Sequence, residues 1–476
     1  MSTSADGLLL KLESLKSLYY AYHHEVEENR RYYARDFKAE VVIGEDDENY
    51  NLWVFIPPTA RRAIDEAADH ILYTPRISVP VIGGAGLPAE ENASMIRLFL
   101  SAWWAHVETH VNVLGDGRKA LLNEGRIVVR KRLRTDLLPD APDKGNRAAR
   151  RRYQRDMSKL GRAQFLWDVE LLDNCDVYED PTNHRDPSYI YVQYDIYAEQ
   201  ARELFPDAAG NWTDLGDYDM VKYTEYWSKP GHKAGAYEPG RYIRWIETER
   251  VDEDDNPYPY IPIAVEDAGY GDMRPRAKVE ERFVGLTQHM REVYIAEARQ
   301  MTTLEAVAEI TGFPLVIARK LAASRNLKVG PRSIVRLAGT DDDPTREQVE
   351  PVAWPAVPES VLHMIAKTTE LANSTLKLNV LGGQAQPGVD TATEADQQIR
   401  NASTKLSGPL AGMQRLVARI SGWVLMDIAD YIEAPVTIYG VAADGSGEVT
   451  LGPKNIDGHY DVRVEFRTTD MDANSQ

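Results

Sequence analysis

The chain has 476 residues, of which 43% are hydrophobic and 27% are charged, and its formal net charge is −19. This length and composition are typical of a soluble globular protein with two to four domains or layers. The acidic balance argues against a protein that grips nucleic acid through its phosphates, because that task requires clustered Lys and Arg. It does not exclude a protein past which nucleic acid must move.

Other classes are excluded by single features. No stretch approaches the roughly 20 consecutive apolar residues of a membrane span. The single cysteine, Cys175, precludes an intrachain disulfide and favours assembly inside a cell. With ten histidines and one cysteine, we expect neither a structural zinc site nor a cofactor. The N-terminus has a short Leu cluster interrupted by Lys11, Glu13 and Lys16, so we expect an amphipathic helix there and not a signal peptide.

The first 125 residues are predicted to be largely helical. A helix over 5–36 follows from apolar residues at spacings of three and four, namely Leu8, Leu12, Leu15, Tyr19 and Tyr22. A second helix is expected at 61–75 and a strand at 76–84. Residues 91–125 are predicted to form two helices that are broken at Gly115–Gly117.

Residues 126–162 form a basic segment, with thirteen Lys or Arg against four Asp or Glu. We expect a projecting arm here. Three interpretations are open: an arm facing solvent or an acidic neighbouring subunit, an arm that contacts packaged nucleic acid, or an arm without a role. Its candidate residues are Arg147, Arg150, Arg151, Arg152 and Arg155.

The next elements alternate in character. Residues 163–265 are rich in β-branched and aromatic residues and are predicted to form several strands. Apolar positions over 278–311 predict one continuous helix of about 30 residues, or about 45 Å. A compact αβ insertion is expected at 313–356, followed by a helix over 358–379.

A loop and a long helix follow. The loop, 380–392, carries Gly382, Gly383 and Gly388 but has no charge before Asp390. The helix is predicted over 393–433, with a kink at Ser407-Gly408-Pro409. Strands are expected in the final β segment, 435–468.

The candidate catalytic motifs of the sequence fail on their spacing or on neighbouring residues. The run "GAGLPA" (84–89) fits a dinucleotide-binding turn, but Glu90 and Glu91 would repel a pyrophosphate at the helix that follows. No P-loop, G-x-S-x-G or H-E-x-x-H motif occurs. Adjacent His23 and His24 point apart on a helix, and the acidic run at 251–257 lacks the Gly and Glu of an EF-hand loop. The sequence therefore predicts no catalytic residue and no metal site, and we do not expect an enzyme.

The order of elements, together with "IPIAVED" before the 278–311 helix and "LGGQAQPGVDTATEADQQIRNASTKLSGPL" after 379, resembles the portal proteins of tailed double-stranded DNA bacteriophages. The resemblance covers most of the chain. It implies an α+β, helix-rich portal-type fold that closes into a ring of twelve subunits at one capsid vertex of the virion, assembled in the cytoplasm of the bacterial host. DNA would enter and leave through the ring.

The resemblance assigns a part to each segment. Residues 1–125 and 163–276, with the kinked helix 393–433, would form the wing. Helices 277–312 and 357–379 would be the stem, and 434–476 would lead toward the crown. The tunnel loop, 380–392, would touch DNA through Gly382, Gly383, Gln384, Gln386, Pro387, Gly388 and Asp390. The clip, 313–356, would dock partners through Arg319, Lys320, Arg325, Lys328 and Arg332.

The implied partners are other copies of the chain, the terminase large subunit, the head–tail connector or adaptor, the major capsid protein and the passing double-stranded DNA, with no membrane. Two other hypotheses remain open. One is a different structural protein of phage head morphogenesis, and the other is a nucleotide-dependent or glycan-active enzyme. The tyrosines and tryptophans fall within the helical and strand patterns, which favours packing in a core or an interface over a sugar site.

Overall fold

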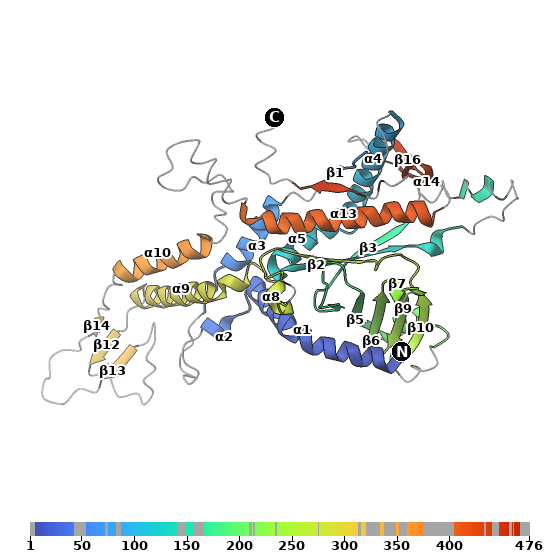
Figure 1. The fold of residues 1–476 in the computed structure, drawn as a ribbon. Coiled ribbons are helices and arrows are strands. Elements are labelled where there is room, and N and C mark those ends of the chain that lie inside the picture. Colours follow the sequence, from blue (N-terminus) through green and yellow to red (C-terminus); the bar gives the residue numbers. More distant parts are fainter. Residues whose placement is uncertain are drawn as a thin grey trace. The chain divides into compact units, whose positions relative to one another are not determined.

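The computed structural model describes the chain over residues 5–41, 54–71, 75–81, 87–139, 149, 151–153, 155–156, 166–208, 212, 215–233, 236–274, 276–312, 316–319, 334–337, 349–351, 359–374, 404–432, 435–439, 447–456, 459 and 461–466. It is a mixed α+β structure, as predicted (Figure 1). The chain divides into two compact units. Unit 1 comprises 1–30, 64–288 and 390–476, and unit 2 comprises 31–63 and 289–389.

A three-stranded antiparallel sheet lies at the centre of unit 1. Its strand order is β11-β2-β3, with β11 at Ile263–Asp267, β2 at Arg126–Leu133 and β3 at Trp167–Leu172. A short 3-10 turn, η1 (Thr135–Leu137), follows β2. The central strand therefore comes from the basic segment that the sequence suggested would project.

A five-stranded antiparallel sheet lies beside it, in the order β10-β9-β6-β5-β4. Helix α1 (Ala5–Ala34) covers one face of this sheet with Leu8, Leu12 and Leu15, against Tyr191 and Trp245. The alternate residues of β5, such as Ile190 and Val192, enter the main core on the other face. The strands are Val177–Glu179 (β4), Tyr189–Tyr197 (β5), Met220–Ser228 (β6), Arg241–Ile246 (β9) and Glu249–Asp255 (β10).

Helices complete the main core of unit 1. Helix α13 (Ser407–Asp430) packs along β11, and α5 (Val113–Glu124) packs on β2 (Figure 1). Helix α4 (Leu87–His110) contributes Trp103 and Trp104, both fully buried. The remaining elements are α3 (Thr59–His70, shared with unit 2), β1 (Arg76–Ser78), α7 (Ala198–Leu204), β7 (Gly231–Lys233), β8 (Ala236–Glu238), α8 (Val279–Arg282), β15 (Val436–Tyr439), β16 (Glu448–Leu451), α14 (Pro453–Ile456) and β17 (Arg463–Glu465).

Unit 2 is a helix pair with a small sheet between the two helices in sequence. Helix α9 (Arg291–Gly312) follows the short turn η3 (Gln288–Met290) and packs beside α10 (Glu359–Ser374). The sheet has the order β13-β12-β14, from Ile334–Leu337, Val316–Arg319 and Val349–Pro351. Helix α2 (Lys38–Val41) packs on α9, where Tyr32, Phe37 and Ala298 are buried in one cluster.

Two helix predictions are wrong in detail. The break in 91–125 lies at Asn112, which has a φ of 54°, and not at Gly115–Gly117. The Glu108 carboxylate accepts hydrogen bonds from the backbone N–H of Leu114 (2.8 Å) and of Gly115, which starts α5. Gly117 instead gives room to Ile127, whose Cδ1 atom lies 2.3 Å from where a Cβ would be.

The predicted continuous helix over 278–311 is also wrong, because the chain leaves helical conformation between α8 and η3. Here Phe283 and Leu286 are buried, and the Leu286 N–H donates to the Leu122 carbonyl at 2.8 Å. A Cβ at Gly285 would lie 1.9 Å from the Asn123 carbonyl oxygen. Tertiary contacts thus outweigh the helical pattern of this segment.

The predicted kink corresponds to a helix start. Residues 404 and 405 are helical, Leu406 is in a turn, and α13 begins at Ser407, which places Pro409 in its first turn. The segment 393–403 lies outside the described residues. Within the part of the chain that the structure describes, no helix is both long and apolar enough to cross a bilayer.

Candidate functional site

Most residues that the sequence nominated for function lie outside the described residues. This holds for the tunnel loop residues Gly382, Gly383, Gln384, Gln386, Pro387, Gly388 and Asp390, for the clip residues Lys320, Arg325, Lys328 and Arg332, and for Arg147 and Arg150. Arg319 ends β12. Arg151, Arg152 and Arg155 are exposed.

A dense set of described charged side chains is instead arranged around β2. In a strand, successive side chains point to opposite faces of the sheet. Arg126, Arg130 and Arg132 therefore share the face that meets the five-stranded sheet, and Lys131 lies on the opposite face, toward α13. Arg126, Arg130 and Lys131 are buried, so each requires a nearby anion.

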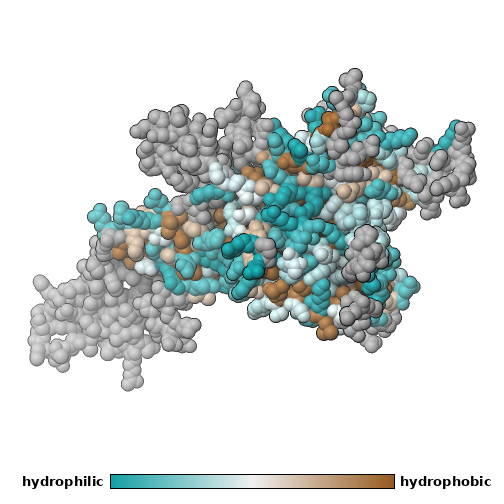
Figure 2. All heavy atoms as spheres, in the orientation of Figure 1, coloured by the Kyte–Doolittle hydropathy of each residue, from teal (hydrophilic) through white to brown (hydrophobic). Residues whose placement is uncertain are grey.

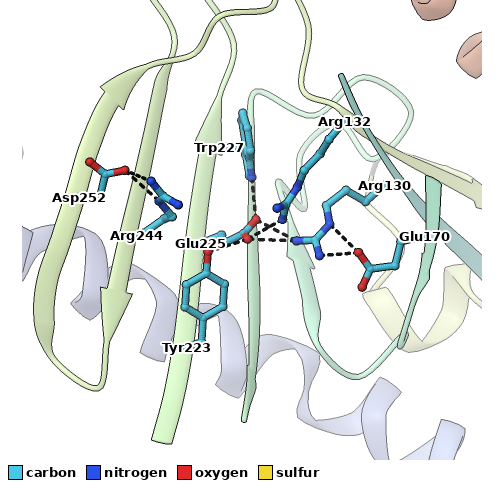
Figure 3. A network of polar contacts seen from close by, with 8 residues as sticks. All are labelled: Arg130, Arg132, Glu170, Tyr223, Glu225, Trp227, Arg244 and Asp252. Carbon is cyan, nitrogen blue, oxygen red and sulfur yellow. Dashed lines mark hydrogen bonds and ion pairs between the residues drawn. The ribbon is translucent and has the colours of Figure 1, made fainter. Parts of the chain in front are cut away.

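Figure 3 shows the largest of these charge networks, which is centred on Glu225 of β6. The Glu225 side chain is fully buried between the two sheets. Arg130 reaches its two carboxylate oxygens at 3.0 and 3.1 Å, and Arg132 reaches Oε1 at 2.7 Å. The Tyr223 hydroxyl and the Trp227 indole N–H donate to the same carboxylate, at 2.8 and 3.1 Å.

The network continues to neighbouring strands. Arg130 lies directly opposite Glu170 in the β2–β3 register and pairs with it at 2.6 Å. In the next strand pair, Arg244 on β9 contacts Asp252 on β10 (Figure 3). Glu225 therefore connects the two sheets, while Glu170 supports Arg130 from the rim.

The electrostatics of Glu225 indicate a structural role. Burial by itself would raise the pKa of this carboxyl, but Arg130 and Arg132 outweigh burial and hold its pKa below the usual value. The carboxylate therefore stays ionised at neutral pH. Its five contacts occupy both oxygens, which leaves no free position for a substrate. The arrangement fixes two sheets together and offers no general base.

A second ion pair lies at the start of β2. The fully buried guanidinium of Arg126 contacts Glu179 of β4 at 3.0 Å and donates to the Val177 carbonyl at 3.1 Å. It also lies near the rings of Phe283 and Tyr22, at 5.0 and 5.8 Å from their centroids. This cation joins β2, β4 and α1.

The third buried pair joins β2 to α13. The Lys131 ammonium contacts Asp427 and donates to the Tyr260 hydroxyl at 2.8 Å. The Trp167 indole N–H and the Tyr260 hydroxyl also donate to Asp427, at 2.9 and 2.8 Å. Burial lowers the pKa of Lys131, although Asp427 acts in the opposite direction. The saturated Asp427 again resembles a structural anchor more than a catalytic acid or base.

The prediction of one basic arm over 126–162 is wrong for its first part, which forms the buried strand β2. Residues 126–133 are core. The available signal was "RIVVRKRL", in which Ile127, Val128 and Val129 form a β-branched run inside the charges. The partners Glu179, Glu225 and Asp427 are distant in sequence, so no local pattern identifies them.

Among the residues that the structure describes, no group of three or more His, Cys, Asp or Glu side chains is arranged to hold a metal ion. Burial raises the pKa of the Cys175 thiol to about 12, so it is not an activated nucleophile. No protein-family model matches this chain, and no curated protein matches it.

Proposed function

We propose that this chain is the portal, or head–tail connector, protein of a tailed double-stranded DNA bacteriophage. In this proposal twelve copies close into a ring at one capsid vertex, and DNA is packaged and ejected through the ring. The terminase large subunit and later the connector dock on the clip, and the major capsid protein surrounds the wing.

The observation that carries the proposal is the construction of unit 2. Helix α9 and helix α10 pack side by side, and the sheet β13-β12-β14 is inserted between them in sequence (Figure 1). This helix–sheet–helix order is what the portal resemblance assigns to the two stem helices and the clip. In this proposal the two packed helices form the rigid stem, and the inserted sheet belongs to the clip on which partners dock.

The chemistry of unit 1 favours a scaffold over the enzyme alternative. The buried carboxylates of Glu225 and Asp427 are saturated by donors within the protein. The net charge of −19 suits a wall past which DNA slides. A cationic wall would bind DNA tightly, because each Lys or Arg that neutralises a phosphate releases a counterion, and an acidic wall avoids this binding. A different head-morphogenesis protein remains the second candidate, since the same features fit a scaffold that does not form a channel.

Electron microscopy of the purified full-length protein tests the proposal. We expect annular particles with a central hole and a single rotational symmetry, because heterologous contacts that close generate rings. Only monomers or dimers at every concentration would refute a portal. Open or solid assemblies would favour the other structural protein of the head.

The tunnel-loop assignment has its own test. Deletion of 383–389 should leave ring formation intact and impair DNA packaging or retention in a reconstituted prohead assay. A glutamate at each of Arg319, Lys320, Arg325 and Lys328 should weaken terminase or connector docking while rings persist. If the loop deletion prevents ring formation, the segment belongs to a core and not to the channel.

A further inference from the structure

A cavity in unit 1 adjoins the Asp427 network through Tyr260, but its other lining residues take no part in the networks described above. Its volume is about 350 Å³, and it lies among α13, the loop before β5, the residue after β6 and the segment that leads into β11. This volume is within the range of sites that hold small molecules or single anchoring side chains.

The cavity has an apolar inner wall. It is lined by Tyr260, Ile263 and Trp423, which are only 8%, 3% and 9% exposed. The Tyr260 and Trp423 rings are stacked, with their planes 2° apart and their centroids separated by 4.6 Å. This packing fixes both rings in place. The wall therefore offers a preformed, rigid apolar surface, of which only a small part of each side chain is exposed.

The rim of the cavity has an excess of cations. It carries Arg185, Lys229 and Arg419 and one carboxylate, that of Asp186. Lys229 is paired with Asp186, and Arg419 is paired with the buried Glu266 at 2.8 Å. No ion-pair partner of Arg185 is found among the described residues.

The position of Arg185 is nevertheless defined. Its backbone carbonyl accepts a hydrogen bond from Arg419 Nη2 at 3.0 Å, so α13 holds this loop at the rim. The rim therefore presents one uncompensated guanidinium beside a largely apolar wall. An arginine in this setting recognises carboxylate, sulfonate or phosphate groups through its planar set of donors.

We propose that this cavity binds aryl anions, meaning ligands with a flat apolar body and an adjacent negative group. The body would lie against Trp423 and Ile263, and the anion would pair with Arg185. Such a ligand can be a free small molecule or an aromatic side chain beside acidic residues in a peptide. The inference concerns one chain and does not depend on ring formation.

The test uses the fluorescent aryl sulfonate 8-anilino-1-naphthalenesulfonate as the probe for the full-length protein. Replacement Arg185→Glu reverses the unpaired charge on an exposed side chain, so the fold should be retained. We expect probe affinity to fall roughly two- to fivefold, as for the loss of one exposed charged contact. The matched control Arg463→Glu, at a site 74% exposed and outside the cavity lining, should leave affinity unchanged.

Two further ligands sharpen the result. The uncharged analogue N-phenyl-1-naphthylamine should bind equally well to the wild type and to Arg185→Glu. A synthetic peptide with the sequence of residues 46–53, DDENYNLW, carries three carboxylates beside two aromatic side chains. It should displace the probe, and its amide counterpart NNQNYNLW should not.

The outcomes are distinct. Displacement by the acidic peptide assigns a peptide source, and a charge-sensitive probe site that ignores both peptides assigns a small-molecule source. Equal probe affinity in wild type and Arg185→Glu, or equal losses in Arg185→Glu and Arg463→Glu, would overturn the proposal.

Discussion

The Glu225 network predicts a large effect of mutation on stability, because one buried carboxylate pairs with both Arg130 and Arg132. We consider Glu225→Gln, which keeps the shape of the side chain and removes its charge. Arg130 retains Glu170 as a partner. Arg132 loses the one carboxylate with which it pairs among the described residues. The new amide NH₂ also meets donors, because every present contact of Glu225 is a donated N–H or O–H.

The expected loss is large. Removal of one partner from a buried ion pair costs about 3–5 kcal/mol. A folded domain has a total stability of about 5–15 kcal/mol, so unit 1 should lose a substantial part of its margin. The carboxylate of Glu170 is 45% exposed, so the matched change Glu170→Gln should cost only about 0–1 kcal/mol.

Urea unfolding followed by tryptophan fluorescence measures both variants, and Trp227 lies within the network. The double variant Glu225→Gln, Arg132→Gln should be more stable than the sum of the single changes predicts, because it removes the unpaired cation. A Glu225→Gln loss below about 1 kcal/mol, or equal losses for Glu225→Gln and Glu170→Gln, would refute the view that burial decides the strength of this contact.

Three other predictions use single sites. Burial, with Asp173, raises the pKa of Asp176 to about 7. Between about pH 4 and pH 7 the native state therefore keeps a proton that the unfolded state has lost, and stability falls as the pH rises. Asp176→Asn should abolish that fall in melting curves measured at different pH values. Burial, with Arg126, lowers the pKa of His23 to about 4, so stability falls as pH drops from about 6.5 to 4, and His23→Gln should remove this opposite slope. A Cβ at Gly412 would lie 2.4 Å from the Asp267 carbonyl oxygen, so Gly412→Ala should destabilise unit 1 by about 1–3 kcal/mol, as measured by urea unfolding. The control Gly231→Ala should be neutral, because open space surrounds that position. If the stability of either titration variant depends on pH as that of the wild type does, the pKa shift of that group does not control stability. A neutral Gly412→Ala would contradict the close contact with Asp267.

Local sequence patterns predicted the helices and strands in which the apolar residues line one face that is buried in the core. Helix α1 follows the spacing of Leu8, Leu12, Leu15, Tyr19 and Tyr22, all of which are buried. Strands β5 and β6 lie where β-branched and aromatic residues alternate. In these segments propensity and burial favour the same structure, so a short window of sequence is sufficient.

Only the tertiary structure decided which conformation the basic segment and the residues after α8 adopt. "RIVVRKRL" is a central strand because Glu179, Glu225 and Asp427 neutralise its cations. Each of these carboxylates lies between 53 and 296 positions along the chain from the cation that it pairs with. The helix expected over 278–311 is interrupted because Leu286 and Gly285 meet Leu122 and Asn123. Charge compensation and close backbone contact act through space, and a pattern read along the chain carries no record of which distant residues will meet.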